Sequence, residues 1–282
     1  MSSQQNSPLG RLNRAHQFVL RPQFGDRLEA EVGKFICRAK IDAAITTCAQ
    51  MVRMDRVHQT SELENSPMTA MFTVLNRLED CCRLRKSPPH PPEVLPYLPD
   101  PLVCYLYLTC FDRLGQPDEW LDFGSWLDSS DCKDERDLIL AEASTASDLE
   151  GSMRIAYRRY SALYGVRSSF CRFLREILSP EMRQELLSSI DRDIVTDSGT
   201  RQATDEEKER YLFKLRNDYT HKSGFTPPPG EWFGRGVASP VQEYHANYWT
   251  STRTLNWPDT LEKTVRVGLA RYLLAVAKGK RN

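Results

Sequence analysis

The sequence predicts an all-α protein, a helical bundle with additional N-terminal helices. Apolar residues recur at helical spacing along most of the chain. The pairs Ser66-Pro67 and Ser179-Pro180 mark two helix starts, because in each a capping serine precedes a proline at the first helical position. We find no segment with the convincing alternation of a half-buried strand, and no internal repeat.

The predicted elements divide the chain into three regions. Residues 1–24 are expected to be a flexible N-terminal arm, residues 25–90 an N-terminal helical region, and residues 91–282 the helical bundle. Residues 87–101 hold seven prolines in fifteen positions, which excludes a helix and predicts a stiff linker. The helices are expected at residues 26–56, 66–86, 101–113, 117–127, 130–146, 147–178, 179–190, 204–222 and 258–278.

Length and charge exclude several classes of protein. The 282 residues contain 38 basic and 38 acidic side chains, so the chain has no global positive field to hold nucleic acid. With 40% hydrophobic and 27% charged residues, the composition is that of a globular chain with one large or two modest domains. The chain has no apolar run long enough for a membrane helix and no apolar signal segment, so we expect a cytoplasmic protein without a membrane partner.

The cysteines and histidines do not predict a metal site. None of the eight cysteines lies in a Cys-x-x-Cys or Cys/His zinc spacing, and several lie in apolar runs where they act as small hydrophobes. Four of the five histidines are scattered singly along the chain: His16, His58, His90 and His245. No metal or other cofactor is therefore expected.

The zero net charge hides two uneven segments. Residues 112–150 hold twelve acidic side chains against three basic ones, whereas residues 151–178 hold six arginines against Glu176 alone. One interpretation is that the basic helix packs near the acidic helices and the charges neutralise each other. The other is that the arginines form a stripe that contacts phosphate groups.

The helix predicted at residues 204–222 carries the sharpest chemical pattern. A capping box, Thr204-x-x-Glu207, starts it. Asn217 and His221 are four residues apart and share one face near its C-terminal end. Arg216 lies about 100° to one side of Asn217, and its long side chain can reach the same patch.

These three side chains suit phosphate chemistry. Histidine titrates near neutrality and can take a proton from a ribose 2′-hydroxyl or give one to a leaving oxygen. Arginine can hold a phosphate with paired hydrogen bonds, and asparagine can orient the imidazole or the phosphate. A structural interpretation stays open, in which His221 is the cation at a helix C-terminus and Arg216 pairs with Asp218 or Glu209.

The segment from Arg216 to His221 resembles the R-x4-H motif of the HEPN-superfamily ribonucleases, including the polar residue after the arginine, here Asn217. The string LRNDYTH is similar to the version found in Apea-like bacterial HEPN proteins. Residues 105–127 and 163–178 also resemble neighbouring helices of such proteins, so the resemblance covers about residues 95–282.

The resemblance implies a HEPN-like helical bundle that forms a homodimer, in which two R-x4-H motifs meet at a shared RNA cleft. It implies that His221 assists attack of the 2′-hydroxyl on the adjacent phosphate, that Arg216 stabilises the phosphate, that Asn217 supports both, and that metal is not required. Arg167 and Arg172 have no histidine at the matching spacing, so they are candidates only for lining the RNA path, together with Lys222.

Two functions therefore compete. The first is a metal-independent endoribonuclease that acts as a toxin or antiviral defence effector. The second is a non-catalytic helical interaction or nucleotide-binding module that keeps the motif for structure. With either function, the first ninety residues are candidates for binding a regulatory protein or an antitoxin.

Overall fold

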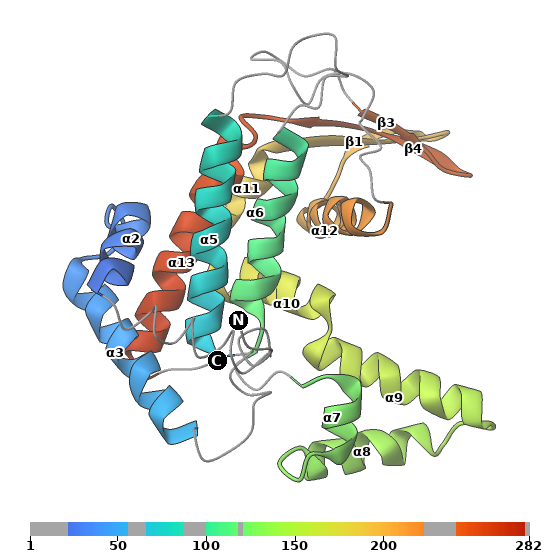
Figure 1. Cartoon of the computed structure of the whole chain (residues 1–282). Helices are drawn as coiled ribbons and strands as arrows, with labels where there is room; N and C mark the ends of the chain where they lie inside the picture. The colour runs from blue at the N-terminus through green and yellow to red at the C-terminus, as the bar shows by residue number, and fades with distance from the viewer. Residues whose placement is uncertain (1–21, 56–65, 87–99, 118–120, 223–240, 280–282) are drawn as a thin grey trace, which may run out of the picture.

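In the computed structural model the described residues are 22–55, 66–86, 100–117, 121–222 and 241–279; they are mainly helical and include a small sheet (Figure 1). The helices are α2 (Pro22–Val32), α3 (Arg38–Asp55), α5 (Pro67–Lys86), α6 (Asp100–Gly115), α7 (Phe123–Asp128), α8 (Lys133–Ala143), α9 (Leu149–Tyr164), α10 (Val166–Arg172), α11 (Pro180–Ser188), α12 (Asp205–Lys222) and α13 (Asp259–Ala277), with a π-helical segment η2 (Phe173–Ile177). The strands are β1 (Ile190–Thr196), β2 (Gly199–Gln202), β3 (Val241–Tyr244) and β4 (Tyr248–Thr254).

The main hydrophobic core lies where α5, α6 and α13 run side by side, with α2 and α3 packed beside α13 (Figure 1). One fully buried residue from each of these five helices belongs to the same cluster: Leu28, Ile41, Leu75, Phe111 and Leu269. Burial of each such side chain contributes about 1.5–3 kcal/mol. The N-terminal helices therefore share their core with helices from the other end of the chain. Within the described residues, no helix has the length and apolar character needed to cross a membrane.

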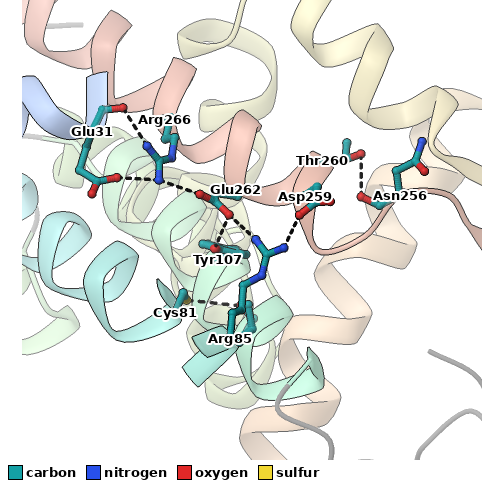
Figure 2. A network of polar contacts seen from close by, with 10 residues as sticks. Glu31, Cys81, Arg85, Tyr107, Asn256, Asp259, Thr260, Glu262 and Arg266 are labelled. Carbon is teal, nitrogen blue, oxygen red and sulfur yellow. Dashed lines mark hydrogen bonds and ion pairs between the residues drawn. The ribbon is translucent and has the colours of Figure 1, made fainter. Parts of the chain in front are cut away.

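A network of charged side chains joins α2, α5 and α13 beside this core (Figure 2). Arg85 of α5 pairs with both Asp259 and Glu262 of α13. Arg266 donates to Glu262 at 2.7 Å and lies 3.0 Å from the carboxylate of Glu31 in α2. Burial raises the pKa of Glu31, and the Arg266 guanidinium opposes that rise. These contacts fix three helices that are far apart in the sequence.

The helices α7, α8 and α9 form a smaller unit that extends away from the main core (Figure 1). It has its own cluster of buried residues, among them Trp126 and Tyr160. Arg159 of α9 forms two hydrogen bonds with Glu142 of α8, at 2.8 and 2.9 Å. This pair confirms, at one position, that the basic segment neutralises the acidic one.

The four-stranded sheet shows that the all-α prediction was wrong for residues 190–202 and 241–254. The sheet is antiparallel with strand order β2-β1-β4-β3, and Ile190 of β1 pairs with Thr254 of β4. Burial alternates along β1, where Ile190, Arg192 and Ile194 are buried. One of these inward positions is an arginine, whose charge is neutralised by Glu243 of β3 at 3.0 Å. A search for alternating apolar residues therefore misses this strand, because a buried arginine occupies one of its inward positions.

Three predicted helix starts are confirmed by capping contacts. Ser66 accepts a hydrogen bond from the backbone N–H of Thr69 at 3.3 Å, and Ser179 caps α11 in the same way. The capping box of α12 has both of its bonds: Glu207 N–H donates to the Thr204 hydroxyl at 3.3 Å, and Thr204 N–H donates to the Glu207 carboxylate at 2.9 Å. Local sequence signals thus position these helices.

Other predicted boundaries were wrong. Residues 22–24 were expected in the arm but form the first turn of α2, and the helix expected at 26–56 is divided into α2 and α3. Among the described residues of the helix expected at 117–127, only those that belong to α7 are helical. The segment 147–178 divides into α9, α10 and η2, and the extended backbone of Gly165, with φ −68° and ψ 152°, separates α9 from α10. The rest of the arm and most of the linker lie outside the described residues.

Gly115 permits a close contact between the end of α6 and the segment formed by α10 and η2. A Cβ atom at this position would lie 1.9 Å from the carbonyl oxygen of Ser169 and 2.7 Å from the backbone nitrogen of Phe173. We expect Gly115→Ala to lower the free energy of unfolding by about 1–3 kcal/mol, because backbone must shift to admit the methyl group. Urea denaturation measures this change. Gly124→Ala is the matched control, since its nearest neighbour is the Asp122 side chain at 3.2 Å; equal losses in both variants would contradict the prediction.

Candidate functional site

The candidate site lies on α12, which runs between the sheet and α6 (Figure 1). Leu212 is fully buried and Leu215 packs against the main core. Tyr219, one turn after Leu215, packs against Tyr105 of α6 with ring centroids 4.1 Å apart and the ring planes tilted by 31°. These contacts turn the C-terminal half of α12 so that Arg216 faces α6.

Arg216 is the centre of a polar cluster between α12 and α6. Its Nε donates to the Asp112 carboxylate at 2.7 Å, and the Arg216 and Asp112 side chains are only 16% and 14% exposed. A second nitrogen, Nη1, lies 3.2 Å from the Asn217 side-chain oxygen and 3.3 Å from the Thr220 hydroxyl. That hydroxyl is also 3.2 Å from the Tyr105 hydroxyl. The guanidinium is thereby held in one orientation.

Asp112 is the group in this cluster whose ionisation is most clearly perturbed. Burial raises its pKa to about 6, and the Arg216 guanidinium opposes this rise, with a smaller contribution from Arg77. One carboxylate oxygen, Oδ2, is bonded to Arg216, whereas the other, Oδ1, has no hydrogen-bond partner among the described residues. Asp112 is therefore ionised and paired at neutral pH and becomes protonated under mildly acidic conditions.

His221 lies in the last turn of α12 and is exposed. It follows Asn217 by one helical turn, so the two residues share a face, whereas Arg216 is about 140° away around the helix axis. Within the described part of the chain, no hydrogen bond joins His221 to Arg216 or Asn217. The structure thus brings Arg216 and Asn217 together and leaves His221 on the surface. Lys222 ends the helix, and its side chain lies outside the described residues.

The two arginines predicted to line an RNA path lie on α10, apart from the Arg216 cluster. Arg172 donates to the backbone carbonyl oxygens of Gly115 at 3.3 Å and Leu163 at 3.4 Å, so its guanidinium joins the ends of α6 and α9. Arg167 is exposed and lines a cavity of about 180 Å³ beside the buried carboxylate of Glu209. Arg167 is therefore the more accessible of the two.

Cysteines and metal-binding groups contribute little to this site. Cys48, Cys81, Cys104 and Cys110 are buried, and burial raises the pKa of the Cys110 thiol to about 12, which keeps it protonated. Among the residues that the structure describes, no group of three or more His, Cys, Asp or Glu side chains is placed to hold a metal ion.

Comparisons with protein-family models, with curated proteins and with solved structures found no match to this chain.

Proposed function

We propose that this protein is a metal-independent endoribonuclease of the HEPN type. The observation that carries the proposal is the fixed guanidinium of Arg216, bonded to Asp112 and Asn217, on the helix whose last turn carries the exposed His221. An oriented arginine can stabilise charge on a phosphate, and an exposed imidazole can exchange a proton with substrate. The pattern matches the residue types that the R-x4-H resemblance assigns to cleavage.

In the proposed reaction His221 accepts the proton of a ribose 2′-hydroxyl while that oxygen attacks the neighbouring phosphorus. The bond from phosphorus to the 5′-oxygen of the next nucleotide breaks, and this oxygen takes a proton from water. The products are a 2′,3′-cyclic phosphate and a 5′-hydroxyl end. Arg216 stabilises the negative charge that develops on the phosphate, and Asn217 keeps the guanidinium in place through its 3.2 Å contact.

We further propose that two copies of the chain form the complete site. Arg216 and His221 of one chain lie about 140° apart around α12, so a phosphate held by one residue is not automatically within reach of the other. A homodimer with α12 at the interface would bring the arginine of one copy near the histidine of its partner. In this proposal the protein is a cytoplasmic toxin or antiviral defence effector, and a regulatory partner or antitoxin controls it.

The second candidate function is a non-catalytic interaction module. The ion pair between Arg216 and Asp112 favours it, because this contact joins α12 to α6 whether or not RNA is cleaved. In this case the motif stabilises the fold, and His221 is only a cation at a helix end, which contributes about 0.3–1 kcal/mol. The two candidates differ in whether purified protein cleaves RNA.

The test is an RNA cleavage assay with a chelator present. We expect wild-type protein to cut single-stranded RNA in EDTA and to leave 2′,3′-cyclic phosphate ends, identified by mass spectrometry. A parallel preparation of His221→Ala controls for contaminating nucleases, and size-exclusion chromatography with light scattering reports the dimer. Absence of cleavage, equal cleavage by the variant, or strict dependence on a divalent metal would overturn the endoribonuclease proposal.

A further inference from the structure

A second polar site lies on another face of α12, between this helix and the sheet. The space between them is a cleft of about 410 Å³. From α12 it receives Glu207, Arg210 and Lys214, which share one helix face at spacings of three and four residues. From β1 it receives Arg192 and Thr196, which share one strand face because they are an even number of residues apart. The cleft is therefore formed by regular structure on both sides.

The lining of this cleft is unusual for a helix packed on a sheet. Such an interface is ordinarily filled by apolar side chains at close packing. Here the only aliphatic side chain among the described lining residues is Ile194, and the others are charged, hydroxyl-bearing or aromatic. A polar space of this volume falls within the range of small-molecule sites, which is about 300–1,000 Å³.

Most charges in the cleft are already paired. Arg201 forms two hydrogen bonds with the Glu207 carboxylate, both at 2.8 Å. Glu243 accepts from Arg192 at 3.0 Å and from Lys214 at 2.5 Å. Burial alone would raise the pKa of Glu243, but the hydrogen bonds from Lys214 and Arg192 lower it, so this carboxylate is ionised at neutral pH. The pairs hold the lining side chains in fixed positions.

Arg210 differs from the other charged residues of the cleft in its pairing. It is exposed, and its one hydrogen bond is a 3.4 Å contact with the backbone carbonyl of Glu206; no carboxylate pairs with it among the described residues. Four cationic side chains and two carboxylates line the cleft, an excess of two positive charges, although Lys214 also donates to Asp218 outside the lining. A phosphate monoester carries a charge of about −1.5 to −2 at pH 7, opposite in sign to this excess.

The cleft also has an aromatic side. His245 and Tyr248 line it and stack on each other, with ring centroids 4.3 Å apart and planes 18° apart. Tyr248 is 41% exposed, so a planar ring can add to this stack. Stacking of a nucleobase on an aromatic side chain contributes about 1–3 kcal/mol in single-stranded nucleic acid complexes.

We infer that this cleft binds a small phosphate monoester that carries a planar ring, of the size of a mononucleotide. Arg210 binds the phosphate, the paired cations beside it add to the positive field, and the stack of His245 and Tyr248 takes the ring. The volume of the cleft favours a free mononucleotide over an RNA strand. The inference does not depend on the proposed nuclease activity, because Arg216 and His221 do not line this cleft.

Isothermal titration calorimetry with AMP tests the inference on the full chain. We expect wild-type protein to bind AMP, Arg210→Gln to bind it at least about tenfold more weakly, and raised salt to weaken binding. Adenosine, which lacks the phosphate, is expected not to bind. Tyr248→Ala is expected to weaken binding of AMP while leaving binding of ribose 5-phosphate unchanged.

Arg154→Gln is the matched control, because Arg154 is an exposed arginine of α9 whose one ion pair among the described residues is with Glu150 of the same helix. We expect Arg154→Gln to bind AMP as wild type does. We expect the same of His221→Ala, so AMP binding can be tested separately from the proposed nuclease activity. Because Arg210 is exposed, we expect Arg210→Gln to keep the fold, and circular dichroism checks this. Lack of AMP binding by wild type at millimolar concentration, or equal affinity in wild type and Arg210→Gln, would refute the inference.

Discussion

His221→Ala is expected to lower the rate of RNA cleavage by about 10²–10⁴-fold, the usual contribution of general acid–base catalysis. The imidazole is exposed at the end of α12, so the substitution removes a proton acceptor without opening a cavity in the core. We expect the free energy of unfolding to change by no more than about 1 kcal/mol. Initial rates on a fluorescent RNA oligomer, combined with urea denaturation of the same preparations, measure both quantities.

Lys278→Ala is the matched control for this substitution. Lys278 is an exposed cation at the C-terminal end of α13, so its removal has the same effect on a helix dipole without touching the candidate site. We expect full cleavage activity in this variant. A similar fall in activity for Lys278→Ala and His221→Ala would show that helix stability, and not proton transfer, accounts for the loss.

Arg216→Lys keeps the charge but loses the planar fork of the guanidinium, and it is expected to lower the rate of RNA cleavage by about 10²–10³-fold.

The helices could be predicted from sequence because their signals are local. The capping box at Thr204 and Glu207 and the serine–proline pair at Ser179 each act within one turn, and each made the predicted contact. The apolar spacing of α6 and α13 likewise predicted both helices, since one buried face repeats every three to four residues.

The sheet depends on contacts between distant residues, and this is why it escaped prediction. Arg192 can occupy an inward position of β1 because Glu243, 51 residues later, accepts its charge. The sequence did contain two weaker signals of the sheet. One is the run of β-branched and aromatic residues in β4, and the other is Gly199, which follows the short turn after β1 and has a φ of 135°. Neither signal is strong enough to predict a strand when a charged residue, Arg192, occupies a position where an apolar residue is expected.

The candidate site was predictable only in part for the same reason. Arg216, Asn217 and His221 are neighbours in sequence, and helical geometry alone places two of them on one face. Asp112 precedes its partner Arg216 by 104 residues, so no local pattern could connect them. Its only signal was a carboxylate in an otherwise apolar helix segment, which indicates a buried charge that needs a partner.

The buried carboxylate of Asp112 is expected to make protein stability depend on pH in a direction opposite to that of an ordinary salt bridge. Its pKa is raised from 3.8 to about 6 by burial, so the folded state holds the proton more tightly than the unfolded chain does. Below pH 3.8 both states are protonated and the group adds no penalty. As the pH rises toward 6 and above, its contribution to stability falls by roughly 3 kcal/mol, since one pKa unit corresponds to about 1.4 kcal/mol.

Asp112→Asn removes this titration while keeping the shape of the side chain and an oxygen that can accept from Arg216. We therefore expect the unfolding free energy of the variant, minus that of wild type, to rise by about 2–2.5 kcal/mol between pH 4 and pH 7. The comparison cancels the titration of all other groups to first order. A difference that stays constant with pH would show that Asp112 ionises normally. A rise of this size would show that the charged carboxylate beside Arg216 lowers the stability of the folded protein at neutral pH, as expected where a perturbed charge is kept in place for a function.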